Sequence, residues 1–250
     1  MNIAIFADKY VGEQCLEYLL KNYFWDVKYI VAINGNEKIK KIIQNYEFNK
    51  KYFLVNSDLN NPCTIKKLYE AKLDYIILAW WPNIINKEII SIPKYGVINF
   101  HPSLLPYCRG KNPNFWSIIE EVPYGVTIHF IDEGIDSGDI LFQRKIEKKW
   151  SDTGETLYKK AIKEIIALFK ESYPKIISMN YARKKQKKDL VTMHYGKELE
   201  LKSQIILDKE YKARELLNLL RARTFDGYPA CYFFENNRKY EIKISINEVK

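Results

Sequence analysis

The chain has 250 residues, 47% of them apolar and 14% aromatic, which is enough for a packed core and for one ordinary domain with a small extension. Its first residues lack a basic segment followed by an apolar one, and no apolar run reaches about 18 residues, so we expect a cytoplasmic protein that does not span a membrane. The net charge of +9 favours anionic partners but does not choose among tRNA, a membrane surface and a small polyanionic substrate. The four cysteines form no Cys-x-x-Cys pair, which argues for reduced thiols and against a zinc site.

Short apolar runs alternate with helical patterns along the first hundred residues. The runs that we expect to be strands are 3–7, 27–33, 52–55, 75–79 and 97–100. Between them, 38–44 and 64–71 carry apolar residues at helical spacing. This alternation predicts an α/β fold with a doubly wound, mostly parallel, Rossmann-like sheet. The turn after the first run contains only Gly12, whereas a pyrophosphate-binding loop needs several glycines, so a nicotinamide cofactor is disfavoured.

An aromatic loop follows the fourth expected strand. It comprises Trp80, Trp81, Pro82, Asn83, Ile84 and Ile85. At the carboxyl end of a strand, such a loop can form one wall of an apolar pocket for a flat ring. Ordinary packing explains it equally well, since tryptophan is usually buried whether or not a ligand is present.

Polar residues gather around two expected strands in the middle of the chain. Asn99 and His101 lie two residues apart, so both side chains leave the same face of their strand. The second strand, 125–131, ends in an acidic, glycine-rich turn that contains Asp136 and can reach back to His101. An amide, an imidazole and a carboxylate suit acyl transfer to an amine, because they stabilise a developing oxyanion and accept the amine's proton. We assign a structural role to His129, which precedes the turn.

The composition changes in the last third of the chain. A helix with an apolar stripe begins after Asp152 and is expected to kink or end at Pro174. The basic run 183–188 then separates a catalytic domain, 1–185, from a small α+β module, 190–250. Within this module we expect a strand at 205–207, a helix at 211–221 and a hairpin made by 232–234 and 240–246. The module can form a wall of the ligand site, a dimer contact, or both.

Two motifs in the middle of the chain are similar to those of a known family. Residues 99–106, Asn-Phe-His-Pro-Ser-Leu-Leu-Pro, are followed by Gly110. Residues 125–128, Gly-Val-Thr-Ile, are followed by Asp-Ser-Gly-Asp at 136–139. With both motifs in this order, residues 1 to about 180 resemble the formyltransferases that use 10-formyltetrahydrofolate.

The resemblance implies catalytic roles and a site for the formyl donor. Asn99 and His101 are expected to polarise the formyl group and stabilise the tetrahedral intermediate. Asp136 is expected to orient His101 and to help remove the amine's proton. The pterin ring of 10-formyltetrahydrofolate is expected between the aromatic loop and the acidic turn, at Trp80, Trp81, Pro82, Asn83, Ile84, Ile85, Asp132, Glu133 and Gly134. No metal is expected.

The acceptor amine divides this family into three branches. Purine-pathway members resemble 126–134 but carry a Gly-rich phosphate loop after the first strand, which this chain lacks. Methionyl-tRNA formyltransferases usually have Arg-Gly-Ala-Ala-Pro where this chain has Arg-Gly-Lys-Asn-Pro at 109–113. The branch that formylates nucleotide-linked amino sugars often has a C-terminal segment resembling 221–233, with Gly at the position of Ala230. The chain is identified as a member of this third branch.

This branch implies a nucleoside diphosphate-sugar substrate and a homodimer, with no nucleic-acid or membrane partner. We expect substrate contacts from Ser103, Arg109, Gly110, Lys111, Asn112, Arg223, Phe225 and Tyr228. The cationic side chains among them suit the two phosphates, and an aromatic ring can stack on the base, although Lys111 is also consistent with solvated surface charge. The expected substrate is dTDP-4-amino-4,6-dideoxyglucose, used for O-antigen. A 3-amino sugar, another base, tRNA formylation and a non-catalytic binding protein remain alternatives.

Overall fold

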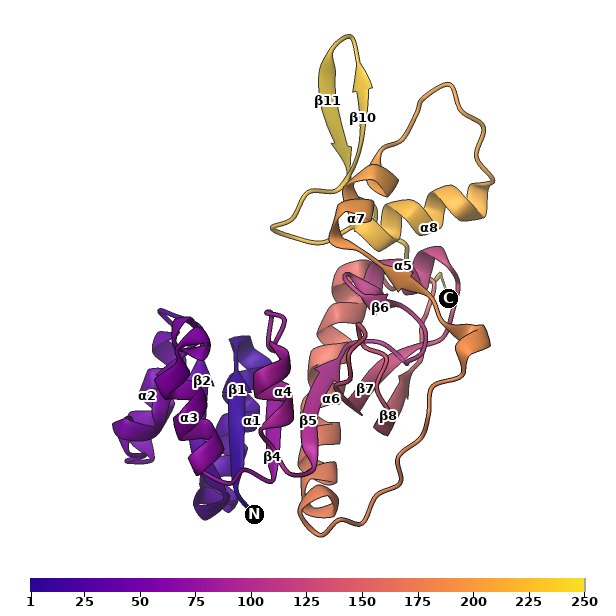
Figure 1. Ribbon diagram of the computed structural model, residues 1–250. Coiled ribbons are helices and arrows are strands. Elements are labelled where there is room, and N and C mark those ends of the chain that lie inside the picture. The colour runs from indigo at the N-terminus through magenta and orange to yellow at the C-terminus, as the bar shows by residue number, and fades with distance from the viewer. Residues whose placement is uncertain (250) are drawn as a thin grey trace. The chain divides into compact units, whose positions relative to one another are not determined.

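The computed structural model describes residues 1–249, and the largest sheet within them has seven strands in the order β3-β2-β1-β4-β5-β7-β8 (Figure 1). These strands are β1 (Ile3–Ala7), β2 (Val27–Ala32), β3 (Phe53–Val55), β4 (Tyr75–Ala79), β5 (Gly96–His101), β7 (Tyr124–Phe130) and β8 (Ile140–Ile146). The first five strands pair in parallel. The predicted α/β fold with a mostly parallel sheet is therefore confirmed.

Asparagine side chains mark the start of three helices. Within residues 1–249 the α-helices are, in chain order, α1 (Lys9–Asn22), α2 (Glu37–Asn45), α3 (Pro62–Glu70), α4 (Lys87–Ser91), α5 (Pro113–Ile119), α6 (Gly154–Ile177), α7 (Gly196–Ser203) and α8 (Ala213–Arg223). The side chains of Asn36, Asn61 and Asn86 accept hydrogen bonds from backbone N–H groups in the first turns of α2, α3 and α4. An asparagine in this position satisfies a donor that the helix itself leaves unpaired. Helix α6 continues through Pro174 and ends three residues after it.

Alternate residues of the parallel strands form one buried layer. Ala4 and Phe6 of β1 pack with Ile76 and Leu78 of β4, and with Val97 of β5. Residues of α3 and α4 cover this layer. The helix α1 contacts β1, and a Cβ on its residue Gly12 would lie 2.9 Å from the carbonyl carbon of Ala7. The single glycine of the first turn therefore permits close packing of α1 against the strand.

Two compact units divide the described chain. One consists of residues 1–101, 128–142 and 165–185, and the other of residues 102–127, 143–164 and 186–250. The first contains β1 to β5 and α1 to α4, together with the acidic turn after β7. The second contains α5, α7 and α8. The predicted boundary between a catalytic domain ending at 185 and a module beginning at 190 stays a prediction.

The second unit contains two small pairs of strands. They are β6 (Arg109–Gly110) with β9 (Met193–His194), and β10 (Cys231–Glu235) with β11 (Arg238–Ile242). The β10–β11 pair is antiparallel and extends from the region of α7 and α8 (Figure 1). Asn236 and Asn237 join its strands with φ angles of 49° and 58°, the left-handed geometry that favours a tight hairpin. The predicted hairpin is confirmed, although β11 ends at Ile242.

The predicted strand at 205–207 is wrong. Only its first residue approaches a strand, because the Ile205 N–H donates to the Tyr232 carbonyl at 2.7 Å. Ile206 and Leu207 then enter a turn, with their side chains 57% and 50% exposed. The Lys209 N–H donates to the Ile206 carbonyl and closes that turn. A short apolar run is ambiguous, and here turn formation uses the backbone group that a strand would have paired.

Among residues 1–249, none of the helices is sufficiently long and apolar to span a bilayer.

Candidate active site

The strand β5 carries two of the predicted catalytic residues out of its carboxyl end. Its Phe100 is buried and its ring centroid lies 5.0 Å from that of Phe169 in α6. Because side chains alternate along a strand, Asn99 and His101 leave by the opposite face. Asn99 is half-buried and His101 is 5% exposed. The hydrophobic contact of Phe100 therefore orients both polar side chains.

The acidic turn after β7 folds around Asp132. The Oδ1 atom of Asp132 accepts hydrogen bonds from the Gly134 N–H at 3.0 Å and from the Ser137 hydroxyl at 2.5 Å. A Cβ on Gly138 would lie 2.0 Å from the carbonyl oxygen of Phe130, so the turn can pass the strand end only with glycine there. These contacts fix the position from which Asp136, with a φ of 49°, extends its side chain.

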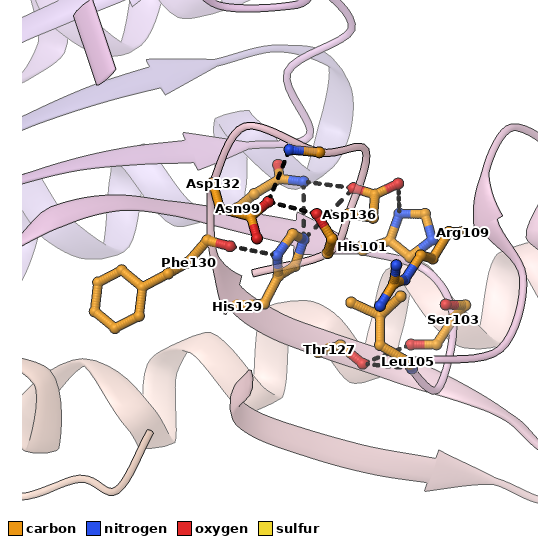
Figure 2. A network of polar contacts seen from close by, with 12 residues as sticks. Asn99, His101, Ser103, Leu105, Arg109, Thr127, His129, Phe130, Asp132 and Asp136 are labelled. Carbon is orange, nitrogen blue, oxygen red and sulfur yellow. Dashed lines mark hydrogen bonds and ion pairs between the residues drawn. The ribbon is translucent and has the colours of Figure 1, made fainter. Parts of the chain in front are cut away.

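Asp136 reaches the residues of β5, as predicted. Its Oδ2 lies 3.4 Å from His101 Nδ1, and its Oδ1 lies 3.5 Å from Asn99 Nδ2 (Figure 2). The Asp136 side chain is 14% exposed, so its charge is only partly solvated. Contacts of this length are common in unliganded sites and shorten when the reacting groups bind. The structure thus brings Asn99, His101 and Asp136 into one cluster.

A second imidazole joins this cluster. His129, in β7, is 1% exposed, and its Nε2 lies 3.3 Å from Asn99 Nδ2 and 3.5 Å from Asp136 Oδ1. Its Nδ1 lies 2.7 Å from the carbonyl oxygen of Phe130 (Figure 2). The sequence-based interpretation gave His129 a structural role because it precedes the acidic turn, whereas the structure places its ring beside Asn99 and Asp136.

The loop after β5 is tied to β7 by a hydroxyl group that the sequence analysis did not single out. Thr127 is fully buried, donates from Oγ1 to the Ser103 carbonyl at 2.7 Å, and accepts from the Leu105 N–H at 3.1 Å. Gln143 in β8 donates to the Leu105 carbonyl at 2.7 Å and to Thr127 Oγ1 at 3.0 Å. The predicted substrate residue Ser103 is 1% exposed, and within residues 1–249 its hydroxyl finds no hydrogen-bond partner.

The aromatic loop at 80–85 combines buried and exposed side chains. Trp81 packs edge-on against Phe6 with ring centroids 5.3 Å apart, while its indole N–H finds no acceptor within residues 1–249. Ile84 is 95% exposed, and Ile85 is buried. A buried unpaired donor beside an exposed apolar side chain fits a flat ring with polar edges, such as a pterin. Pro82 and Asn83 are exposed as well.

An ion pair links the start of α4, just after this loop, to the acidic turn. Lys87 Nζ lies 3.2 Å from Glu133 Oε1, with both side chains more than 80% exposed. Exposed pairs of this kind contribute at most about 1 kcal/mol, so the link is weak. Through this ion pair, the two segments predicted to hold the pterin are joined at their outer edge.

Trp80, whose φ is 60°, begins the aromatic loop in a left-handed conformation.

The predicted cationic substrate residues differ in their surroundings. Arg109 donates from Nε and Nη2 to Gln186 Oε1 at 3.1 and 2.7 Å. Lys111 is exposed, and its backbone N–H donates to the His194 carbonyl. Arg223 is buried, with Nε bound to Ser203 Oγ at 2.9 Å and Nη2 3.3 Å from Glu200 Oε2. The charge of Arg223 is thus already paired inside its own unit.

The remaining predicted substrate residues also lie in the second unit. A Cβ on Gly110 would lie 2.3 Å from the His194 carbonyl oxygen, so glycine permits the β6–β9 pairing. Asn112 has a φ of 58° and precedes α5. Phe225 and Tyr228 contact each other edge-on with centroids 4.9 Å apart, and Tyr228 is 59% exposed. Within residues 1–249, no cluster of three or more His, Cys, Asp or Glu side chains is arranged to hold a metal.

Comparison with characterised proteins relates the chain to formyltransferases. It is 32% identical over 184 residues to methionyl-tRNA formyltransferase of Caldanaerobacter subterraneus, which covers 73% of this chain. The chain spans 55–58% of the length of three methionyl-tRNA formyltransferases to which it is 31–35% identical, this one included.

Two solved structures cover more of the chain. A 4-N formyltransferase from Francisella tularensis is 24% identical with a TM-score of 0.82, over 99% of this chain and 98% of that one. The formyltransferase PseJ from Anoxybacillus kamchatkensis, in complex with UDP-4,6-dideoxy-4-formamido-L-AltNAc and tetrahydrofolate, is 27% identical with a TM-score of 0.58, over 80% and 89% of the two chains. Residues 198–248 match the N-formyltransferase dimerization C-terminal domain. Residues 31–171, more than half of the chain, match the formyl transferase family. The chain belongs to the formyl transferase family.

Proposed function

We propose that the protein transfers a formyl group from 10-formyltetrahydrofolate to the amine of a dTDP-linked amino-dideoxyhexose, with dTDP-4-amino-4,6-dideoxyglucose as the first candidate. The observation that supports this reaction most strongly is the cluster of Asn99, His101 and Asp136, with contacts of 3.4–3.5 Å to the carboxylate. The folate-bound PseJ structure supports the donor, and both similar structures support a 4-amino sugar.

The residues of the cluster suit attack by an amine without a protein nucleophile. When bound, the donor supplies an electrophilic formyl carbon on its N10 nitrogen. Asn99 donates a hydrogen bond to the formyl oxygen as it gains negative charge. His101, whose Nδ1–H faces Asp136, donates to the same oxygen from Nε2 when its ring is an imidazolium. Asp136 holds the imidazole of His101 through Nδ1 and takes part in removing the amine's proton. The new C–N bond forms as the C–N10 bond breaks, and N10 gains a proton, so atoms and charge balance.

The donor is proposed to lie between the aromatic loop and the acidic turn. The unpaired indole N–H of Trp81 and the exposed Ile84 provide one polar and one apolar contact for a pterin. Asp132, Glu133 and Gly134 follow the other expected edge, where the Gly134 N–H already binds Asp132. The pterin is held there by a combination of ring contacts and hydrogen bonds to backbone groups.

A nucleotide-linked sugar is preferred over initiator tRNA as the acceptor. The matched C-terminal domain is that of N-formyltransferases, and the 4-N formyltransferase from Francisella tularensis aligns along 99% of this chain. The methionyl-tRNA formyltransferase from Clostridium thermocellum also aligns along 99% of this chain, but with a TM-score of 0.67 against 0.82. Arg109 and Lys111 are the proposed phosphate contacts, because Arg223 already pairs with Glu200. Surface polysaccharide synthesis, including O-antigen, is the proposed use of the product.

The C-terminal module is proposed to form a homodimer through the β10–β11 hairpin. This hairpin is a two-stranded sheet. On the outer edge of β10 the Tyr232 carbonyl accepts from the Ile205 N–H, and beyond this bridge no further strand of the described chain pairs with the hairpin. Phe233 and Tyr240 stack on each other with centroids 5.3 Å apart, and Tyr240 and Phe234 are 43% and 52% exposed. Apolar rings beside open edges are suited to pairing with a second copy, in accord with the matched dimerization domain.

The test is an activity assay with a panel of acceptors. The purified protein is incubated with 10-formyltetrahydrofolate and, separately, dTDP-4-amino-4,6-dideoxyglucose, a dTDP-3-amino-3,6-dideoxyhexose, the UDP-linked 4-amino analogue, or charged initiator methionyl-tRNA. Mass spectrometry records the addition of one formyl group. The proposal expects fastest formylation of the dTDP-4-amino sugar, and formylation slowed by roughly 100-fold or more with Asp136→Asn. Formylation of tRNA alone, or donor binding without turnover of any acceptor, overturns it.

A further inference from the structure

His129 is a buried histidine whose two ring nitrogens both have defined partners. Nδ1 lies 2.7 Å from the carbonyl oxygen of Phe130, and Nε2 lies 3.3 Å from Nδ2 of Asn99. The ring is 1% exposed and stands nearly perpendicular to that of His101, with centroids 6.3 Å apart. The second imidazole therefore contacts the catalytic amide from the side that is closed to solvent.

The partner of Nδ1 determines the tautomer of His129. A backbone carbonyl can only accept a hydrogen bond, so Nδ1 carries the proton. In the neutral ring, Nε2 then has a lone pair and accepts. The end of the Asn99 carboxamide that faces Nε2 must accordingly be its NH2 group. Asp136 Oδ1 lies 3.5 Å from the same Nε2, which is longer than an ordinary hydrogen bond.

The second acceptor near Asn99 requires the same orientation. Asp136 Oδ1, which as part of an ionised carboxylate can only accept hydrogen bonds, lies 3.5 Å from the same Nδ2 atom. If the carboxamide were flipped, its oxygen would face the lone pair of His129 and the carboxylate of Asp136 together. We propose that His129 is a positioning residue that holds the NH2 end of the Asn99 carboxamide toward Asp136. One N–H of this group donates to His129, and the other is presented to the formyl oxygen.

The contact between Asn99 and His129 leaves the second N–H available for the reaction. The 3.5 Å separation from Asp136 is long, so that N–H can exchange its partner for the formyl oxygen at small cost. The 3.3 Å contact to His129 lies on the buried side and persists while the formyl group reacts. This inference rests on the proposed formyl transfer, in which Asn99 stabilises the developing oxyanion.

The backbone carbonyl that fixes His129 is itself held in place. The Phe130 N–H donates to the Asp139 carbonyl at 2.9 Å, across the base of the acidic turn. The carbonyl oxygen of Phe130 lies so close to Gly138 that a Cβ there would be 2.0 Å away. The glycine of the turn, the Phe130 carbonyl, His129 and Asn99 thus form a continuous series of contacts. The orientation of the amide is set before any ligand binds.

Two substitutions of His129 separate positioning from packing. His129→Gln places a carbonyl oxygen near the position of Nε2 and keeps an acceptor for Asn99, whereas His129→Leu fills similar space without one. We expect His129→Leu to lower kcat by roughly 30- to 100-fold with the KM of both substrates within about threefold, because the misoriented amide acts on the transition state. His129→Gln is expected to recover kcat to within about tenfold of wild type. Equal losses in both variants, or a change confined to KM, overturn the inference.

Nitrogen NMR tests the same inference without turnover. In protein with 15N-labelled histidine, we expect His129 to show a protonated Nδ1 and an unprotonated Nε2 at neutral pH. The opposite tautomer, or an imidazolium, overturns the proposal even if the enzyme is fully active. Absence of formyl transfer by the wild-type protein would instead refute the proposed function, so the two failures are distinguishable. The midpoints of thermal unfolding of His129→Leu and His129→Gln serve as the control. If they lie within a few degrees of each other, the difference in kcat does not come from folding.

Discussion

His101 and Asp136 face each other across the end of the sheet, with His101 Nδ1 3.4 Å from Asp136 Oδ2. His101 comes from the last position of β5, whereas Asp136 extends from a turn that follows β7. The imidazole is 6% and the carboxylate 14% exposed at the side-chain level. A partly desolvated carboxylate that receives an N–H from an imidazole fixes both the ring orientation and its tautomer. The catalytic predictions depend on this pair.

Asp136→Asn is expected to lower kcat by roughly 10²- to 10⁴-fold, because a neutral amide no longer selects the Nδ1–H tautomer of His101. The volume is unchanged, so the midpoint of thermal unfolding should stay close to that of wild type. Steady-state kinetics and differential scanning calorimetry measure the two quantities. Activity within about tenfold of wild type, less than about 1.4 kcal/mol of barrier, would contradict the assignment of Asp136.

Gly138→Ala is expected to damage the acidic turn, since its Cβ would lie 2.0 Å from the Phe130 carbonyl oxygen and 2.8 Å from the carbonyl carbon. Relief of this overlap should cost about 1–3 kcal/mol of unfolding free energy and displace Asp136 from His101. Gly196→Ala is the matched control, because a Cβ at Gly196 meets nothing within 4 Å. Urea unfolding and kcat are measured for both variants, and equal behaviour of the two would exclude a special role for Gly138.

Thr127→Val removes the hydroxyl that binds the loop after β5. The backbone groups of Ser103 and Leu105 and the amide of Gln143 all contact this oxygen in a buried environment. We expect a loss of about 1–3 kcal/mol in unfolding free energy, because these partners become unsatisfied while the side-chain volume is kept. Thr127→Ser retains the hydroxyl and should lose less. Chemical denaturation compares them, and a valine variant as stable as the serine variant would show that the loop does not depend on these bonds.

The oligomeric state should respond to charge on the hairpin. The double variant Phe234→Glu, Tyr240→Glu replaces half-exposed rings on β10 and β11 by carboxylates. We expect the dissociation constant of the proposed dimer to increase at least tenfold. Sedimentation velocity over a range of concentrations measures the change. Trp25→Glu is the control, because Trp25 is 83% exposed but lies in the other unit. A hairpin variant that stays dimeric would place the interface elsewhere.

Thiol labelling should distinguish one cysteine from the other three. Cys63 is exposed, whereas burial raises the pKa of Cys15 well above its usual range. Burial, with the charge of Glu120, raises the pKa of Cys108 to about 12, and burial raises the pKa of Cys231 to about 12. We expect one fast-reacting thiol at pH 8 and four after unfolding, counted by mass spectrometry.

The same pKa shifts predict the direction of alkaline unfolding. Cys108 and Cys231 keep their protons to higher pH in the folded chain than in the unfolded chain. The stability that depends on their neutral form is therefore complete below their ordinary pKa of 9.0 and decreases as the pH rises toward about 12. Urea unfolding at pH 8 and pH 10.5 measures this loss. Stability that increases over this interval would contradict the burial of both thiols.

The sequence by itself determined the parallel sheet and the family. Continuous apolar runs separated by helical patterns predict buried parallel strands, and β1, β2, β4 and β5 lie where those runs occur. Alternation along β5 predicts that Asn99 and His101 share a face, because this depends only on strand geometry. The Asn-Asn pair between two aromatic segments likewise predicts the hairpin, since a tight turn needs left-handed residues.

The tertiary structure decided which side chains besides Asp136 join Asn99 and His101. The position of His129 follows from the sheet order, which places β7 beside β5, and no local pattern in the sequence encodes that adjacency. The hydrogen bonds of Thr127 and the pairing of Arg223 with Glu200 depend on contacts between segments distant in the chain. The run at 205–207 does not form a strand, because within it only Ile205 donates a hydrogen bond to a strand residue, Tyr232, and Ile206 accepts one that closes a turn. Periodicity determines which face a side chain occupies, whereas its partner depends on long-range packing, which a single sequence does not specify.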